Sequence, residues 1–110
     1  MDVSRRNWVF LVAGIPAAGK SAFSEYLHRE RGWLHLDIDD LVGRSKPWPS
    51  VALQQSWNEA IQTNDPAVLV QACRQTTKNV VIDWGFPIQR IPFVRGLAAQ
   101  GMRIFGSMEM

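Results

Sequence analysis

The segment from Gly14 to Ser21 combines two glycines with a lysine and a serine directly after the second glycine. It reads Gly-Ile-Pro-Ala-Ala-Gly-Lys-Ser and fits the pattern G-x-x-x-x-G-K-[ST]. Glycine reaches backbone angles closed to other residues, so successive N–H groups can point inward at an anion. The catalytic candidate Lys20 would reach nucleotide phosphates, and the Ser21 hydroxyl would bind Mg2+. The predicted binding segment is Gly14, Ile15, Pro16, Ala17, Ala18, Gly19, Lys20, Ser21 and Ala22.

The residues on either side of this segment predict a strand and a helix. The apolar run 8–12 is typical of a buried strand, and 21–31 has apolar residues at helical spacing. Gly32 is placed to end that helix. A strand, a glycine-rich loop and a helix form the setting that the motif requires. The alternative interpretation is a glycine-rich turn that binds no ligand.

The rest of the chain alternates between predicted strands and helices. Further strands are expected at 33–38, 79–83 and 102–106, and apolar residues recur at helical spacing within 53–61, 69–76 and 91–98. Asp65 and Pro66 suit the N-cap and first residue of the middle helix. The alternation predicts an α/β fold whose parallel sheet is covered by helices on both faces. We expect a single domain over 1–110, without repeats or linkers.

Acidic residues follow two of the predicted strands, at the sheet edge where such folds bind ligands. Asp83 ends the third strand and could hold Mg2+, or it could be a turn or cap residue. Asp37 and Asp39 end the second strand. Either could accept a proton from an acceptor hydroxyl, and the alternative is a solvated acidic turn. Asp40 is predicted to be the N-cap of the turn that follows.

Several other side chains are weaker candidates. His35 is predicted to be packed or exposed rather than catalytic. Arg44 and Lys46 could meet an anionic acceptor, and Trp48 could stack on a ring-shaped one; a solvated loop and simple packing are the alternatives. Trp84 and Phe86 could line an acceptor pocket.

Charge and composition limit the classes of partner. The formal net charge is +2 and the basic residues are scattered, which gives little support for nucleic-acid binding. The single cysteine, Cys73, predicts a buried, reduced thiol. We find no signal peptide and no segment long enough to span a membrane, so a cytoplasmic location is expected.

Three segments together resemble the small P-loop kinases of the nucleoside, shikimate and gluconate kinase type. They are Gly14 to Ser21, Leu-Asp-Ile-Asp-Asp at 36–40 and Val-Val-Ile-Asp-Trp-Gly-Phe at 80–86. The likeness is greatest to the AAA-type ATP-binding kinase-like group that includes chloramphenicol phosphotransferase and zeta toxin. The resemblance covers about residues 8–106.

The resemblance implies a P-loop NTPase fold, a three-layer α/β/α sandwich with a parallel sheet of four strands in the order 2-3-1-4. It implies ATP and Mg2+ as cofactors and transfer of the γ-phosphate to a hydroxyl of a small-molecule acceptor. It implies Lys20 on the phosphates, Ser21 on Mg2+, and Asp37 or Asp39 at the acceptor or as the base. Asp83 resembles the aspartate that supports Mg2+ in such proteins.

The chain departs from this family after its fourth strand, where such kinases usually continue into an arginine-bearing lid and a fifth strand. Lid arginines stabilise charge on the transferred group, so the alternative function is a nucleotide-binding module with little turnover. A vestigial loop in a structural α/β domain is a third interpretation. The uncovered fourth strand also predicts a homodimer that pairs near Ile104 and Phe105.

Overall fold

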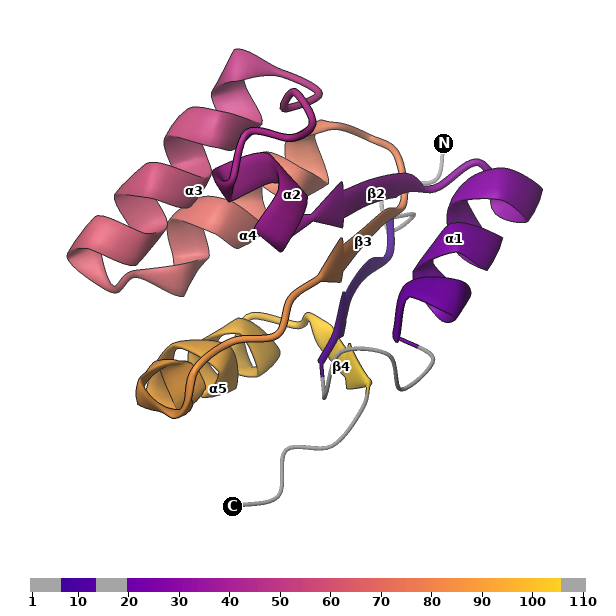
Figure 1. Cartoon of the computed structure of the whole chain (residues 1–110). Helices are drawn as coiled ribbons and strands as arrows, with labels where there is room; N and C mark the ends of the chain where they lie inside the picture. The colour runs from indigo at the N-terminus through magenta and orange to yellow at the C-terminus, as the bar shows by residue number, and fades with distance from the viewer. Residues whose placement is uncertain (1–6, 14–19, 106–110) are drawn as a thin grey trace, which may run out of the picture.

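The computed structural model of the chain describes residues 7–13 and 20–105 (Figure 1). The predicted phosphate-binding residues 14–19 lie outside the described residues, as do the side chains of Lys20 and Ser21. The described backbone shows the elements on either side of them. No helix in the described ranges is both long and apolar enough to cross a membrane.

Four strands form one parallel sheet at the centre of the fold. They are β1 (Val9–Val12), β2 (Leu34–Asp37), β3 (Val80–Asp83) and β4 (Arg103–Phe105). Their order is β2-β3-β1-β4, with all three pairings parallel. The sequence prediction of a parallel four-stranded sheet in the order 2-3-1-4 is therefore confirmed.

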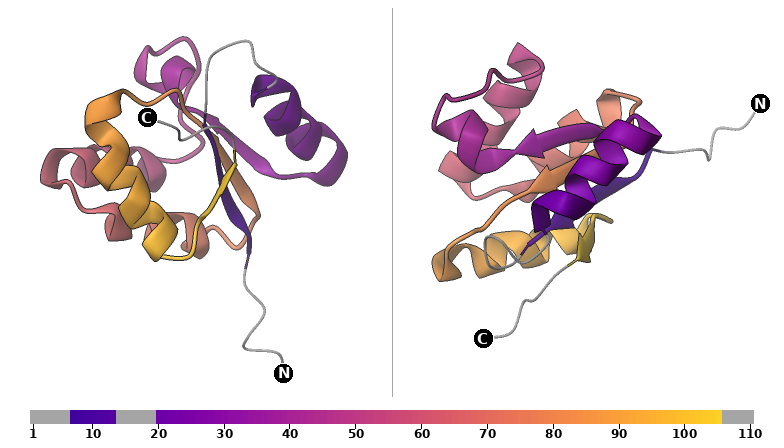
Figure 2. Two further views of the ribbon diagram at one scale, coloured as in Figure 1. Left: turned by 90° about the horizontal axis from the view of Figure 1, so that it is seen from below. Right: turned by 45° about the vertical axis from the view of Figure 1, so that its right-hand side comes forward.

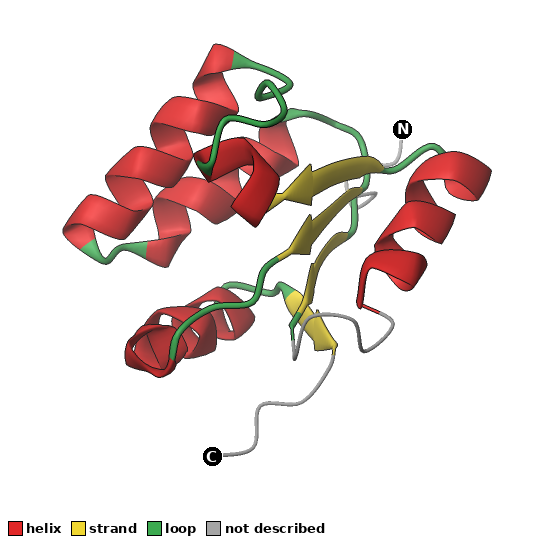
Figure 3. Cartoon of the chain, in the orientation of Figure 1, coloured by secondary structure: helices red, strands yellow, loops and turns green. Residues whose placement is uncertain are grey.

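Helices cover both faces of the sheet (Figures 2 and 3). Helix α1 (Lys20–Arg31) covers one face. The other face carries α4 (Pro66–Gln75) and α5 (Ile91–Ala99), with α3 (Val51–Thr63) alongside α4. The short helix α2 (Ile38–Val42) follows β2, and a single 3-10 turn, η1 (Ile88–Arg90), precedes α5. The predicted α/β class is confirmed.

The sheet separates two apolar clusters of unequal size. The larger lies between the sheet and helices α2 to α5 and includes the fully buried Leu11, Leu36 and Phe93. The smaller lies under α1 and includes Leu27 and Val81. Side chains alternate along a strand, so β3 directs Val80 and Ile82 into the larger cluster and Val81 and Asp83 toward α1. A carboxylate at the end of the central strand thus faces α1.

Most of the predicted helix boundaries are confirmed. The Asp65 side chain accepts a hydrogen bond from the amide of Ala67 at 3.1 Å, and Pro66 is the first residue of α4. Gly32 follows α1 as predicted, with a φ angle of 72° that favours glycine. Gly101 follows α5 in the same way, with a φ angle of 98°. Cys73 is buried as predicted, and burial raises the pKa of its thiol to about 12.

The sequence prediction was wrong at the end of β2. The strand ends at Asp37, and the next five residues form α2 rather than a turn capped by Asp40. Asp37 is the N-cap: its backbone is extended, and its side chain accepts from the Asp40 amide at 3.4 Å. Asp40 lies inside the helix. A capping residue must precede the first helical turn, and Asp37 occupies that position.

Candidate functional site

The carboxyl ends of β1, β2 and β3 lie level with one another. Val12 pairs with Asp83 in the sheet register, and Asp83 pairs with Asp37 on its other side. Alternation along the strands places Asp37 and Asp83 on the face that α1 covers. Two of the acidic residues selected from the sequence therefore meet at one edge of the sheet.

The neighbouring strands β1 and β3 lead to opposite faces of the sheet. The chain passes from β1 to α1 on one face and from β3 to α5 on the other. In open parallel sheets such a switch point opens a crevice beyond the strand ends, which is the usual place for a ligand. Phe23 of α1 stacks on Phe105 at the end of β4, with ring centroids 5.6 Å apart. The early turns of α1 thus lie beside this edge.

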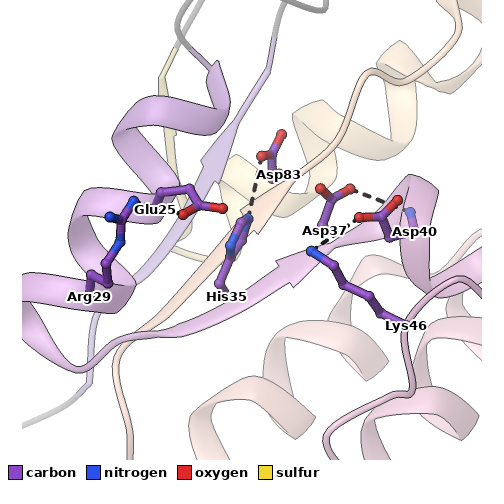
Figure 4. A network of polar contacts seen from close by, with 7 residues as sticks. All are labelled: Glu25, Arg29, His35, Asp37, Asp40, Lys46 and Asp83. Carbon is purple, nitrogen blue, oxygen red and sulfur yellow. Dashed lines mark hydrogen bonds and ion pairs between the residues drawn. The ribbon is translucent and has the colours of Figure 1, made fainter.

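Asp83 is the most deeply buried member of the site, with no exposed side-chain surface. His35 of β2 lies beside it, and its Nε2 is 3.4 Å from Asp83 Oδ2 (Figure 4). The His35 side chain is 11% exposed. Sequence reasoning placed His35 among packed or exposed residues and missed this contact. The alternation of β2, which puts His35 and Asp37 on one face, was the available signal.

Asp37 combines a structural contact with an unusual charge environment. Burial raises the pKa of the Asp37 carboxyl, and the hydrogen bond that this carboxyl accepts from the Asp40 amide lowers it. The negative charges of Asp40 and Asp83 raise the Asp37 pKa further, so the net shift is upward. His35, Asp37 and Asp83 each offer a ligand atom, and these atoms lie within 4.8 Å of one another. Asp39 is exposed on α2 and is not part of this cluster.

A second polar group lies beyond Asp37 on the same side of the molecule. Lys46 Nζ is 3.2 Å from Asp40 Oδ2, and the Ser45 hydroxyl donates to Asp40 Oδ1 at 3.0 Å. These bonds lower the pKa of the Asp40 carboxyl, and the partner carboxylate raises the pKa of Lys46. Asp40 therefore connects Asp37 to the loop after α2 (Figure 4).

A cavity of about 800 Å³ opens between α2, the following loop and α3. The half-buried Trp48 lines it beside Trp57, with ring centroids 6.4 Å apart. The lining also includes apolar residues and several longer polar side chains, among them Arg44, Lys46, Gln54 and Asn58. A cavity with an aromatic wall and cationic side chains suits a ring-shaped anionic compound.

Trp84 packs into the core instead of lining this cavity. It is 6% exposed and meets Trp57 edge to face, with ring centroids 5.0 Å apart. Phe86 packs beside it at 5.4 Å. The structure thus favours packing as the interpretation of these two aromatic residues.

No family model, curated protein or solved structure matches the chain. The resemblance to small P-loop kinases stays a prediction from the sequence.

Proposed function

We propose that the chain binds ATP with Mg2+ and transfers the γ-phosphate to a hydroxyl group of a small molecule. One observation carries the proposal. The motif G-x-x-x-x-G-K-S spans the connection from β1, which ends at Val12, to α1, which begins at Lys20. This strand–loop–helix setting is the one in which the motif binds phosphate, and α1 adds the partial positive charge of its N-terminus.

The neighbouring carboxylates support a phosphotransfer chemistry. In this proposal Lys20 contacts the β- and γ-phosphates, and Ser21 and Asp83 hold Mg2+. The acceptor oxygen bonds to the γ-phosphorus, the bond from that phosphorus to the β–γ bridging oxygen breaks, and ADP leaves. The hydroxyl proton passes to the Asp37 carboxylate, whose raised pKa favours a base. Asp39 is the less favoured base because it is exposed and outside the cluster.

The cavity beside α2 is the proposed acceptor site. The contacts from Lys46 to Asp40 and from Asp40 to Asp37 lead from its rim to the sheet edge. Trp48 offers a stacking surface, and Arg44 and Lys46 offer positive charge. Acceptors that carry a hydroxyl, a ring and an anionic group are therefore the first class to assay.

Nucleotide binding is the first step to test, with a fluorescent ATP analogue and Mg2+. We expect Lys20→Ala to weaken nucleotide binding at least tenfold, because the variant lacks the ammonium group that contacts the phosphates in this proposal. The matched control is Lys78→Ala, which removes an exposed lysine just before the start of β3, at the opposite edge of the sheet. Equal affinity in the Lys20→Ala variant and the native chain would indicate a vestigial loop.

Turnover separates a kinase from a binding module. ADP release is measured against a panel of hydroxyl compounds, with and without rings and anionic groups. We expect acceptor-dependent release, and we expect Asp37→Asn to lower it about 10²-fold or more, in the range typical for a general base. Tight nucleotide binding without any acceptor-dependent release would favour the alternative, a nucleotide-binding module.

A further inference from the structure

We propose that His35, Asp37 and Asp83 form a site for one divalent transition-metal ion, which binds without nucleotide and is preferred over Mg2+. The site takes ions that accept an imidazole nitrogen, such as Zn2+, Co2+ or Mn2+. It goes beyond the proposed kinase function because it needs neither Lys20 nor the loop 14–19.

The backbone fixes the positions of all three side chains. His35 and Asp37 lie two residues apart on β2, so both point to the face that α1 covers. Asp83 is the register partner of Asp37 on the neighbouring strand β3. Paired strands of a sheet hold such positions closely, so an ion would meet ligands that are already gathered.

The separations suit a shared ion. Two ligand atoms about 2.1 Å from a metal at a tetrahedral angle lie about 3.4 Å apart. His35 Nε2 and Asp83 Oδ2 are 3.4 Å apart, longer than the ~2.7–2.9 Å of a strong charged hydrogen bond. The three ligand atoms lie within 4.8 Å of one another. The last torsion angle of an aspartate side chain varies over a broad range, so rotation of a carboxylate can shorten the longest separation.

The charge of the cluster also favours a cation. The fully buried Asp83 and the half-buried Asp37 bring two carboxylates together at this edge of the sheet. Two ion pairs lie close to the cluster, Arg29 with Glu25 at 2.9 Å and Lys46 with Asp40 at 3.2 Å (Figure 4). A divalent ion would balance the charge of the two carboxylates.

The donor set indicates which ions bind. Mg2+ takes oxygen ligands almost exclusively, whereas an imidazole with two carboxylates suits zinc and its neighbours. Water would complete the coordination. Because the ion would occupy both Asp37 and Asp83, its binding would remove the proposed base and the proposed Mg2+ ligand together. Zn2+ is therefore expected to inhibit any phosphotransfer.

Metal binding is tested on the full chain after chelator treatment, without nucleotide. Zn2+ and Mg2+ are titrated by calorimetry, and Co2+ by its visible absorption. We expect one Zn2+ or Co2+ per chain and Mg2+ binding at least tenfold weaker. In proton NMR spectra, Zn2+ should also shift the ring signals of His35 more than those of His28, the other histidine of the chain.

Matched variants identify the ligands. We expect His35→Ala, His35→Gln and Asp37→Asn each to weaken Zn2+ binding at least tenfold. Even the loss of a residue that only hydrogen-bonds to a metal ligand typically lowers metal affinity by about 10–100-fold. His28→Ala and the exposed Asp39→Asn should not change the affinity. Circular dichroism checks each fold. Unchanged affinity in both folded His35 variants, or Mg2+ binding as tight as Zn2+ binding, would overturn the proposal. Lys20→Ala should retain Zn2+, so this test and the nucleotide test can fail separately.

Discussion

Asp37 has two structural roles that different substitutions separate. Its side chain caps α2, and its charge lies in a partly buried position beside other carboxylates. Because the folded state raises its pKa above the ordinary value of 3.8, the native chain holds this proton more tightly than the unfolded chain. The free energy of unfolding therefore decreases as the pH rises from 3.8, the pKa in the unfolded chain, to the raised pKa of the folded chain. At neutral pH the ionised Asp37 carboxylate destabilises the fold.

The Asp37→Asn variant should be at least as stable as the native chain at pH 7, because asparagine caps as well as aspartate and carries no charge. Its advantage should disappear as the pH falls toward 3.8. Asp37→Ala loses the cap and should cost about 1 kcal/mol relative to Asp37→Asn. Urea unfolding at a series of pH values measures both effects. An asparagine variant less stable than the alanine variant would contradict the cap assignment.

The contact between helices α4 and α5 depends on a glycine. A Cβ added at Gly96 would lie 2.6 Å from Cγ of Pro66, which starts α4. Gly96→Ala should therefore destabilise the fold by about 1–3 kcal/mol, although alanine is the better helix former by about 1 kcal/mol. The double variant Gly96→Ala, Pro66→Ala removes the obstructing ring carbon.

A double-mutant cycle of thermal or urea unfolding measures this coupling. We expect the second substitution to recover most of the loss, because alanine at position 66 ends at Cβ, which is 3.6 Å from the added atom. Additive losses would mean that the two helices meet differently at this point.

The elements with strong periodicity could be predicted from the sequence, and the short one could not. The apolar runs that became β1 and β3 are buried strands of a parallel sheet, and Asp65 with Pro66 marked the start of α4. Helix α2 has only five residues and too little periodicity to distinguish it from a turn. Its N-cap was therefore assigned to Asp40 instead of Asp37.

The site was predictable in outline because parallel strands end at one edge. That rule alone predicts that Asp37 and Asp83 lie near one another. The contribution of His35 depends on the register between β2 and β3, which a single sequence does not encode locally. The cavity beside α2 could not be predicted either, because it depends on how α2 and α3 pack.

At the scale of the whole molecule, β4 forms one edge of the sheet and pairs with β1. Phe105 directs its carbonyl to Ala13, so the N–H and C=O of Ile104 point to the outer side. Among residues 7–13 and 20–105, no strand pairs with the outer side of β4, and such an edge is a template for pairing. The half-exposed Trp8 beside Arg103 adds apolar surface there. We therefore expect two chains to associate along this edge.

Sedimentation equilibrium up to tens of micromolar should detect the dimer, and Ile104→Pro should weaken it by removing the outward N–H. Circular dichroism must show that this variant is folded. A native chain that sediments as a clean monomer over the whole range would contradict the association, and so would a folded Ile104→Pro variant that still dimerises as tightly.

The burial of Asp83 in the central strand has a consequence for cooperativity. β3 is hydrogen-bonded on both sides, and all four of its residues are buried. Segments of this kind usually exchange their amide hydrogens only through global unfolding. We therefore expect the Asp83 carboxylate to keep its position for as long as the domain is folded, so the stability of the whole domain, and not that of one loop, holds this ligand in place.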